Sequence, residues 1–153
     1  MSTHQEDTEI VYYPKEPKVE KVFRRDCLEV RILKEGKVLP IFVCHFKSMI
    51  PSREETKPIR EAEAKAVRKI LERRFGDPCI HDGLVVGDLN DYTETDGMPD
   101  PDHGLRPILD ISVDMIKRIR NPFWRWTTFY PKMQKYQQLD YILSPFQNYL
   151  YHH

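Results

Sequence analysis

The stretch LVVGDLNDY at residues 84–92 decides how the rest of the chain is interpreted. An apolar run ends at Gly87 and is followed by Asp88 and Asn90, two residues apart. Gly, Asp and Asn are common turn residues, so one interpretation is a polar turn after a buried strand. The other is an active-site edge, because open α/β sheets place their chemistry beyond the carboxyl ends of strands. On this stretch alone both interpretations stay open.

The composition indicates one folded domain. The chain has 153 residues, of which 40% are hydrophobic and 31% are charged, as in ordinary globular proteins. Its 24 basic and 24 acidic residues cancel, so binding to nucleic acid needs a local patch. No apolar run reaches the roughly 18 residues of a membrane span, and the first 20 residues lack the apolar core of a secretory signal. Three cysteines without a C-x-x-C spacing favour a reducing compartment, so we expect a cytoplasmic protein.

The first third of the chain predicts a lead-in and a hairpin. Residues 1–18 carry two prolines and many charges and are expected to be extended or disordered, which leaves 19–153 as the folded domain. LEVRI at 28–32 alternates apolar and charged residues, which is typical of a half-buried strand. VLPIFVCHF at 38–46 is rich in β-branched and aromatic residues and predicts a second strand buried on both faces.

Two helices and two further strands are predicted after the hairpin. A helix over 58–75 has Pro58 in its first turn, one apolar face, and a glycine just beyond it. A second amphipathic helix is predicted over 105–119, followed by strands at 125–130 and 138–143. This order predicts an α/β (α+β) domain of mixed sheet with flanking helices. No G-x-G-x-x-G or G-x-x-x-x-G-K pattern follows a strand, which excludes dinucleotide-binding and P-loop folds.

Polar residues follow the predicted strands at comparable positions. His45 and Lys47 end the hairpin, Asp88 and Asn90 end the next strand, and Asp140 lies inside QLDYIL. A carboxylate in such an apolar strand is costly to bury unless it is paired. Its partner can be a lysine in the preceding loop, Lys132 or Lys135, which would make Asp140 purely structural. Alternatively, these residues form one shared edge.

A shared edge of this kind suits the hydrolysis of phosphate esters. Asp88 can orient or deprotonate a water molecule or, with Asn90, hold Mg²⁺ or Mn²⁺. Asn90 can also donate to a phosphate oxygen, and His45 can donate to the phosphoryl group. Arg25 and Lys47 are candidate phosphate contacts. Each residue also has an ordinary interpretation, since histidines at strand ends are often structural and surface cations are common.

Taken together, these segments resemble the endonuclease/exonuclease/phosphatase superfamily, which includes deoxyribonuclease I-like nucleases, sphingomyelinases and inositol polyphosphate phosphatases. The resemblance runs from about residue 22 to 146 and rests on segments in a fixed order: FRRDCLEV, IFVCHFKS, REAEAKAVRKIL, VVGDLND, and RWTTF leading into QLDYILSP. It implies a sandwich of two mixed β-sheets with helices outside. The implied activity is hydrolysis of phosphate esters with a divalent metal, usually Mg²⁺.

The resemblance also assigns roles by position. His45 resembles the histidine of the family's H-x-K-S motif, which contacts the scissile phosphate. Asp88 and Asn90 resemble the G-D-x-N pair, which orients the attacking water and the phosphate. Asp140 resembles the aspartate of the L-D-Y motif, which supports a catalytic histidine. By this resemblance, the strand ends on Asp and Asn because the phosphate binds there.

Two parts of the family pattern do not match this chain. The strands that carry an asparagine and the metal-binding glutamate have no counterpart before Phe23. The Ser-Asp-His strand has none after the L-D-Y segment, and the closing His152 and His153 lack the preceding aspartate. The chain is therefore expected to be the central and second-half portion of the fold, with apolar sheet surface left uncovered. We expect a homo-oligomer, or a complementary chain that completes the fold.

Two functions follow from these observations. One is a metal-dependent, nuclease-like phosphodiesterase acting on DNA, RNA or another phosphate ester. The other is a catalytically incomplete half-domain that binds phosphate or nucleic acid or serves in assembly. A basic and aromatic cluster offers a surface for a nucleic-acid strand, although an ordinary helix end with core tryptophans fits equally well. It comprises Lys117, Arg118, Arg120, Trp124, Arg125 and Trp126.

Overall fold

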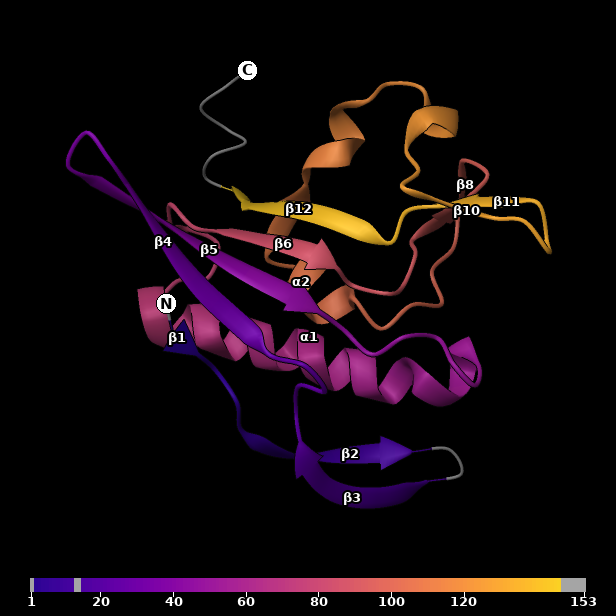
Figure 1. The fold of residues 1–153 in the computed structure, drawn as a ribbon, viewed down its shortest axis with the longest axis horizontal. Coiled ribbons are helices and arrows are strands. Elements are labelled where there is room, and N and C mark those ends of the chain that lie inside the picture. The colour runs from indigo at the N-terminus through magenta and orange to yellow at the C-terminus, as the bar shows by residue number, and fades with distance from the viewer. Residues whose placement is uncertain (1, 13–14, 147–153) are drawn as a thin grey trace.

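The structure, a computed structural model, describes residues 2–12 and 15–146 (Figure 1). It confirms the predicted α+β class, with a mixed sheet, one long helix and smaller elements around them. His152 and His153, considered above as a counterpart of the family's last motif, lie outside the described residues. No helix within the described part of the chain has the length and apolarity needed to cross a bilayer.

The main sheet has six strands in the order β1-β4-β5-β6-β12-β9. Their bounds are β1 Ser2–Thr3, β4 Cys27–Lys34, β5 Lys37–His45, β6 Leu84–Asp88, β12 Asp140–Pro145 and β9 Ser112–Asp114. β5 and β6 are parallel, and every other neighbouring pair is antiparallel. A parallel pair needs a crossover connection, which the helix α1 (Arg53–Phe75) supplies.

The helix α1 begins five residues earlier than predicted. Ser52 caps it, because its hydroxyl oxygen accepts the backbone N–H of Glu55 at 3.2 Å and donates to the Glu55 carboxylate at 3.0 Å. Ser-x-x-Glu is the capping-box pattern, so the true start was present in the sequence. Pro58 therefore lies inside the helix rather than in its first turn. At the other end Gly76 closes the helix as predicted, with its N–H bonded to the Glu72 carbonyl.

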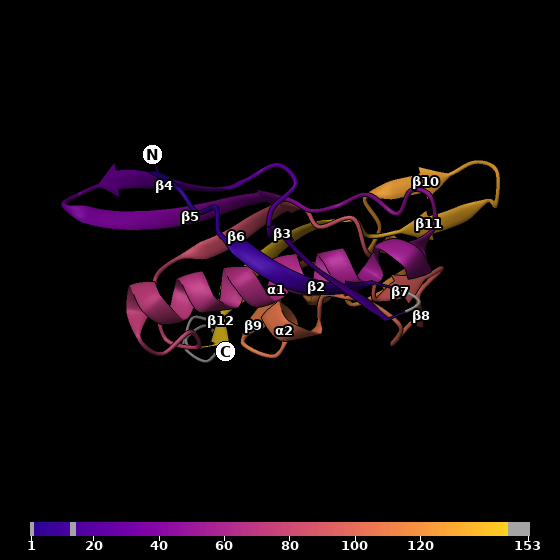
Figure 2. The ribbon, with the colours of Figure 1, turned by 90° about the horizontal axis from the view of Figure 1, so that it is seen from below.

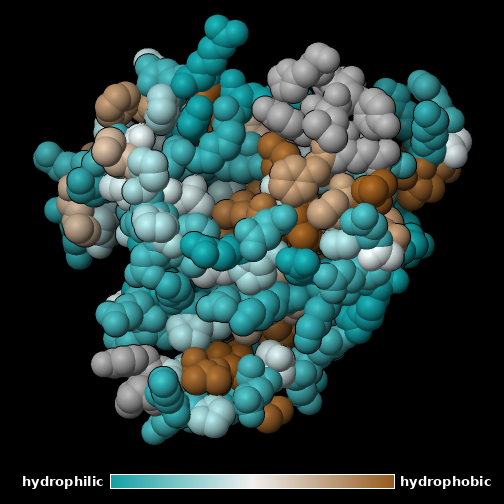
Figure 3. Space-filling view, turned by 180° about the vertical axis from the view of Figure 1, so that it is seen from behind, coloured by the Kyte–Doolittle hydropathy of each residue, from teal (hydrophilic) through white to brown (hydrophobic). Residues whose placement is uncertain are grey.

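One face of the main sheet packs against α1 (Figure 2). The core between them includes Phe42 and Cys44 from β5 and Val67 and Leu71 from α1, all at most 2% exposed. Cys44 also meets Cys27 of β4, with 3.6 Å between the two sulfur atoms. The face of the molecule that points away from the viewer in Figure 1 is drawn in Figure 3. It is mainly hydrophilic, with small separate hydrophobic patches.

The opposite face of the sheet, called here the open face, is apolar but exposed. The alternation predicted for β4 is present, but its apolar side points away from α1, whereas Glu29 is 2% exposed on the helix side. The prediction that 38–46 is buried on both faces is wrong, since Val43 is 38% exposed and Ile142, in the same row, is 53% exposed. The apolar residues of this face are Leu28, Val30, Ile32, Leu39, Ile41, Val43, Leu84, Val86 and Ile142.

The lead-in is extended, as expected, but it is paired. β2 (Asp7–Tyr12) and β3 (Glu16–Lys21) form an antiparallel hairpin, so the expected boundary at residue 18 falls inside a strand. Ile10 anchors the hairpin on α1 and is 1% exposed. The charges that suggested disorder face solvent on both strands.

The predicted second helix is wrong. The region 105–119 forms a short helix α2 (Arg106–Leu109), the strand β9 and a 3-10 turn η1 (Met115–Arg118). Residues 112–114 pair instead with the edge of β12, a tertiary contact that overrides local helical periodicity. A second turn η2 (Pro122–Trp124) then leads to a small four-stranded sheet. Its strands are β10 Thr128–Tyr130, β11 Lys135–Gln137, β7 Glu94–Thr95 and β8 Met98–Pro99.

Candidate functional site

Three polar residues stand side by side on the open face, at one end of the main sheet. His45 of β5 is the register partner of Asp88 of β6, and Asp88 is also the partner of Asp140 of β12. The ends of β5 and β6 and the start of β12 lie together in Figure 1. The His45 Nε2 and Asp88 Oδ2 atoms are 3.9 Å apart. We call these three residues the polar row.

Asp140 is not buried, contrary to the sequence argument. At the start of β12 exposed and buried residues alternate, so Asp140 and Ile142 face solvent while Tyr141 is buried. Pairing with the candidate lysine Lys135 is not seen, since that ammonium group donates to Asp96 at 2.8 Å. The backbone N–H of Asp140 donates to the Thr127 hydroxyl at 3.0 Å. The carboxylate is therefore a surface group next to Asp88.

Asp88 combines a turn role with an unusual charge environment. Its Oδ1 accepts the backbone N–H of Asn90 at 2.9 Å, which is the polar turn of the first interpretation. Burial raises the pKa of Asp88, and the neighbouring Asp140 charge raises it further. The Asn90 N–H bond and the nearby His45 and Arg25 side chains oppose this rise only in part. Asp88 thus holds a proton at higher pH than an ordinary aspartate, which suits a group that exchanges protons.

Asn90 and Arg25 both bind the same backbone carbonyl. Asn90 adopts a positive φ of 50° and is 8% exposed. Its Nδ2 donates to the Phe46 carbonyl at 3.0 Å, and Arg25 Nη1 donates to that oxygen at 3.3 Å. Asn90 therefore fastens the end of β6 to the end of β5, and the exposed Arg25 brings a positive charge close to Asp88.

Lys47 is close in sequence but its ammonium group is turned into its own loop. It donates to the carbonyls of Ile50 at 2.6 Å and Ser48 at 3.2 Å. Burial and the nearby cations Arg60 and Arg24 lower the pKa of Lys47. In this conformation Lys47 does not join the polar row.

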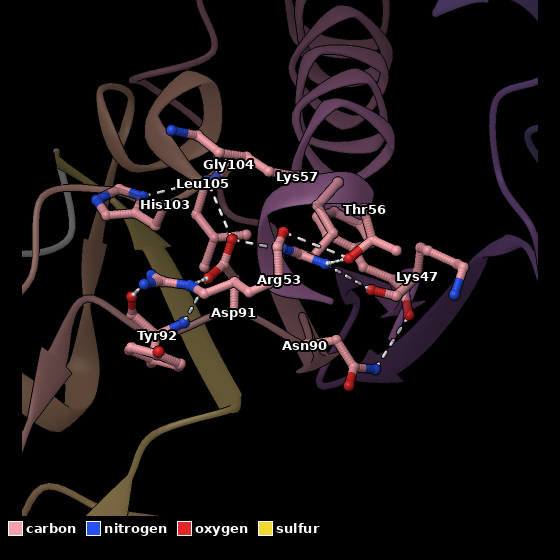
Figure 4. Close-up of polar contacts among 12 residues, drawn as sticks. Lys47, Arg53, Thr56, Lys57, Asn90, Asp91, Tyr92, His103, Gly104 and Leu105 are labelled. Atoms are coloured by element: carbon pink, nitrogen blue, oxygen red, sulfur yellow. Dashed lines mark hydrogen bonds and ion pairs between the residues drawn. The ribbon is translucent and has the colours of Figure 1, made fainter. Parts of the chain in front are cut away.

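Sequence reasoning missed a buried ionic network that holds the loops following β5 and β6 (Figure 4). The Asp91 side chain is 0% exposed and accepts Arg53 Nε at 2.8 Å and Arg60 Nε at 3.0 Å. It also accepts the backbone N–H groups of Gly104 at 2.9 Å and Tyr92 at 3.0 Å. The loop after β6 is thereby fixed to the start of α1.

The same helix also holds the loop after β5. Arg60 donates to the Thr56 hydroxyl at 2.6 Å and to the Lys47 carbonyl at 3.4 Å. Glu63 accepts the backbone N–H groups of Lys47 at 2.8 Å and Arg24 at 3.4 Å. Burial raises the pKa of Glu63 to about 7 against the effect of these two bonds.

A signal for this network was present in the sequence. Residues 60, 63, 67 and 71 lie on one helical stripe, so a charged residue at either of the first two positions falls on the buried face. Charges on an apolar stripe are rarely buried unless they are paired. They therefore indicate a network under the loops that the helix supports.

The donor atoms at the edge that suit a divalent cation are the carboxylates of Asp88 and Asp140 and the side-chain oxygen of Asn90. Within residues 2–12 and 15–146, no three His, Cys, Asp or Glu side chains gather closely enough to hold a metal ion. The Asn90 amide nitrogen is engaged with Phe46. Mg²⁺ nevertheless needs few protein ligands, because it keeps several waters and binds one or two carboxylates together with substrate phosphates.

The comparisons with known proteins show a distant structural similarity. No family model matches the chain, and no curated protein matches it. Among solved structures, the chain is similar to the crystal structure of a beta toxin from Staphylococcus aureus, with a TM-score of 0.49 and 18% sequence identity. The alignment covers 75% of this chain and 41% of that chain, so this chain spans less than half of that protein's length.

Proposed function

We propose that the chain is a phosphodiesterase that uses a divalent metal and hydrolyses phosphate esters at the polar row. The observation that carries the proposal is the register of His45, Asp88 and Asp140, which sets one imidazole beside two carboxylates at an exposed sheet edge. The resemblance to the endonuclease/exonuclease/phosphatase superfamily supports the same assignment, because His45, Asp88, Asn90 and Asp140 are the positions it selects.

Each residue of the row has a role that follows from its position. Asp88 orients the attacking water, because its Oδ1 is held by the Asn90 N–H while its Oδ2 faces His45. His45, which is half exposed, donates a hydrogen bond to a phosphate oxygen in front of the sheet. The Arg25 guanidinium neutralises charge on the same phosphate. Asn90 holds the two strand ends at a fixed separation through the Phe46 carbonyl.

Asp88 would hold the metal ion, with Asp140 as the neighbouring carboxylate. When bound, such an ion stabilises negative charge on the phosphoryl oxygens and lowers the pKa of a bound water. The carboxylate pair also explains why a cation would be favoured here, because the charge on Asp140 opposes ionisation of Asp88.

Hydrolysis of bis(p-nitrophenyl) phosphate tests the proposal. The full chain is assayed with titrated Mg²⁺ and Mn²⁺, beside Asp88→Asn and a matched control, Asp110→Asn. Asp110 is an exposed aspartate at the end of α2, away from the row. Metal-dependent turnover that Asp110→Asn keeps and Asp88→Asn loses supports the proposal. Equal turnover in both variants, or none in the parent chain, overturns it.

A second candidate function is favoured by the open face. Nine apolar side chains from four strands point away from α1, and the strongest alternation in the sequence, that of β4, directs its apolar side there. A surface of this kind marks a protein interface. In this view the chain is a half-domain that acts as a phosphate-binding or assembly module, with a second copy or a complementary chain covering the face.

A further inference from the structure

One segment of the chain combines a net positive charge with several aromatic rings. Between Asp114 and Asp140 there are no acidic residues, whereas six of the 24 basic residues lie there. We call residues 115–139 the basic arm; it contains η1, η2, β10 and β11. Because the whole chain has a formal net charge of zero, the rest of the chain carries a net charge of −6. The arm is therefore a local patch of the kind that nucleic-acid binding needs.

The aromatic side chains of the basic arm are all on the surface. Trp124 is 66% exposed and Trp126 41%, so the interpretation of core tryptophans is wrong. Trp126, Tyr136 and Phe129 lie side by side, with ring centroids 5.0 Å and 4.7 Å apart. The exposed rings of the arm are Phe123, Trp124, Trp126, Phe129, Tyr130 and Tyr136. Such rings are normally buried for their large apolar area, so their exposure indicates a binding surface.

The arm keeps an excess of positive charge after its internal pairing. Lys117 and Arg125 both contact the Glu94 carboxylate, and Lys135 contacts Asp96. Three cations thus share two carboxylates. Arg120 and Lys132 are exposed and have no ion pair within the described residues. Arg125, between the two tryptophans in the sequence, is not one of the free cations, because its side chain is 16% exposed and donates to the Ile119 carbonyl at 2.6 Å.

A hollow in the arm is lined by the same rings. A cavity of about 260 Å³ lies between η2 and β11, with Phe123, Trp126 and Tyr136 in its wall, and Glu94, Asp96 and Arg125 also line it. The flat aromatic walls suit a planar heterocycle, whereas the charge of Arg125 is already met by Glu94.

The arm joins the polar row directly. The Thr127 hydroxyl, at the start of β10, accepts the backbone N–H groups of Leu139 and Asp140, each at 3.0 Å. In Figure 1 the small sheet with β10 and β11 extends beyond the start of β12, on the side where β5 and β6 end. A polymer lying along the arm therefore passes the polar row.

We propose that the basic arm binds single-stranded nucleic acid and leads it to the polar row, an inference that rests on the proposed function for the second step. Rings stack only on bases that are free of a partner strand, which favours a single strand over a duplex. Exposed rings together with the exposed cations Arg120 and Lys132 match a polymer that carries both bases and phosphates.

Fluorescence anisotropy of a labelled 12-nucleotide oligo(dT) tests the binding step. It is measured in EDTA, so that the result does not depend on turnover. Trp124→Ala removes one exposed ring, and stacking of about 1–3 kcal/mol per base predicts about 5- to 150-fold weaker binding. Arg120→Glu with Lys132→Glu removes two free cations and is expected to reduce the salt slope of log K by about 1.4.

A matched control keeps this test specific. Lys34→Glu with Lys37→Glu makes the same charge change at the exposed β4–β5 turn and is expected to leave the affinity within about twofold, since it lies outside the arm. Equal loss in both double variants overturns the inference, as does equal binding of a duplex. Preferential binding of phosphatidylserine vesicles, with no competition by oligo(dT), also overturns it. If Asp88→Asn still binds oligo(dT) and the parent chain shows no hydrolysis, the basic arm binds single-stranded nucleic acid but the proposed function is rejected.

Discussion

Arg60 and Asp91 form an ion pair of 3.0 Å in which neither side chain has any exposure to solvent. The pair joins the second turn of α1 to the loop that follows Asp88 and Asn90. A buried pair of this kind does little for stability compared with apolar packing, but removing one partner leaves an uncompensated buried charge. Its position between α1 and that loop indicates that it fixes the loop geometry.

Neutralising Asp91 should therefore be costly. Asp91→Asn leaves Arg53 and Arg60 without their shared carboxylate, and we expect a loss of about 3–5 kcal/mol in the free energy of unfolding. Urea unfolding measures it. The matched control is Asp100→Asn, whose carboxylate also meets Arg53 at 2.9 Å but is 28% exposed, and it should cost about 1 kcal/mol or less. Equal costs for the two variants would contradict a special role for Asp91.

Glu63 should make stability depend on pH. Its pKa is raised from 4.5 to about 7 by burial, so the folded state favours the protonated form. Its contribution is fully present below about pH 4.5 and is lost as the pH rises through about 7, an effect of about 3 kcal/mol. Since Glu63→Gln does not titrate, the stability of the parent relative to this variant should fall between pH 5 and 8.

Urea unfolding at several pH values measures this difference. Both proteins contain His81 and His103, whose lowered pKa values make stability rise with pH. Subtracting the stability of the variant from that of the parent cancels this contribution. Glu61→Gln, which removes a surface carboxylate paired with Lys65, is the control and should show no such trend. A pH-independent difference for Glu63→Gln would refute the assignment.

Gly87 should tolerate no side chain. Its φ is 132°, and a Cβ atom would lie 2.0 Å from the Cys44 carbonyl oxygen on the neighbouring strand. Gly87→Ala should lower the free energy of unfolding by more than about 3 kcal/mol or prevent folding. Gly36→Ala is the control, because Gly36 also has a positive φ but has open space around it, and it should cost about 1–2 kcal/mol. Circular dichroism during urea titration measures both, and similar costs would show that the close approach is unimportant.

The open face should cause self-association. Sedimentation velocity at micromolar concentration should show species heavier than 18.3 kDa, because the face exposes a continuous apolar surface. Val43→Lys places a charge in its centre and should shift the chain toward monomer. Val19→Lys, on the hairpin and 71% exposed, should leave the distribution unchanged. A parent chain that sediments as a clean monomer would contradict this expectation.

The sequence predicted most of the main sheet but not the direction of its faces. Strong alternation marked β4, and a run of β-branched and aromatic residues marked β5. Neither pattern tells which side of the sheet a helix will cover, so the exposure of Val43 was not predictable from periodicity alone. The helix predicted over 105–119 was wrong for another reason. Residues 112–114 pair with β12, and such a long-range contact leaves no local pattern in the sequence.

The candidate site was likewise predicted only in part. The polar residues at the ends of β5, β6 and β12 were found because their types are unusual at strand ends, and the structure brings His45, Asp88 and Asp140 together. Asp91 was overlooked although it lies within the opening stretch, because its partners Arg60 and Arg53 are 31 and 38 residues away in α1. The ammonium of Lys47 bends toward its own loop, which depends on side-chain conformation and has no sequence signature.

The cysteines give the chain a built-in chemical reporter. Cys27 and Cys44 are at most 2% exposed, whereas Cys79 is partly accessible. The contact with Cys27 and burial raise the pKa of the Cys44 thiol, which keeps it unreactive in the closed sheet. An alkylating reagent should modify one sulfur quickly and the other two only when α1 moves away from β4 and β5. The rate of that slow modification therefore times the opening of the core behind the strand that ends at His45, in the unaltered protein and without any label.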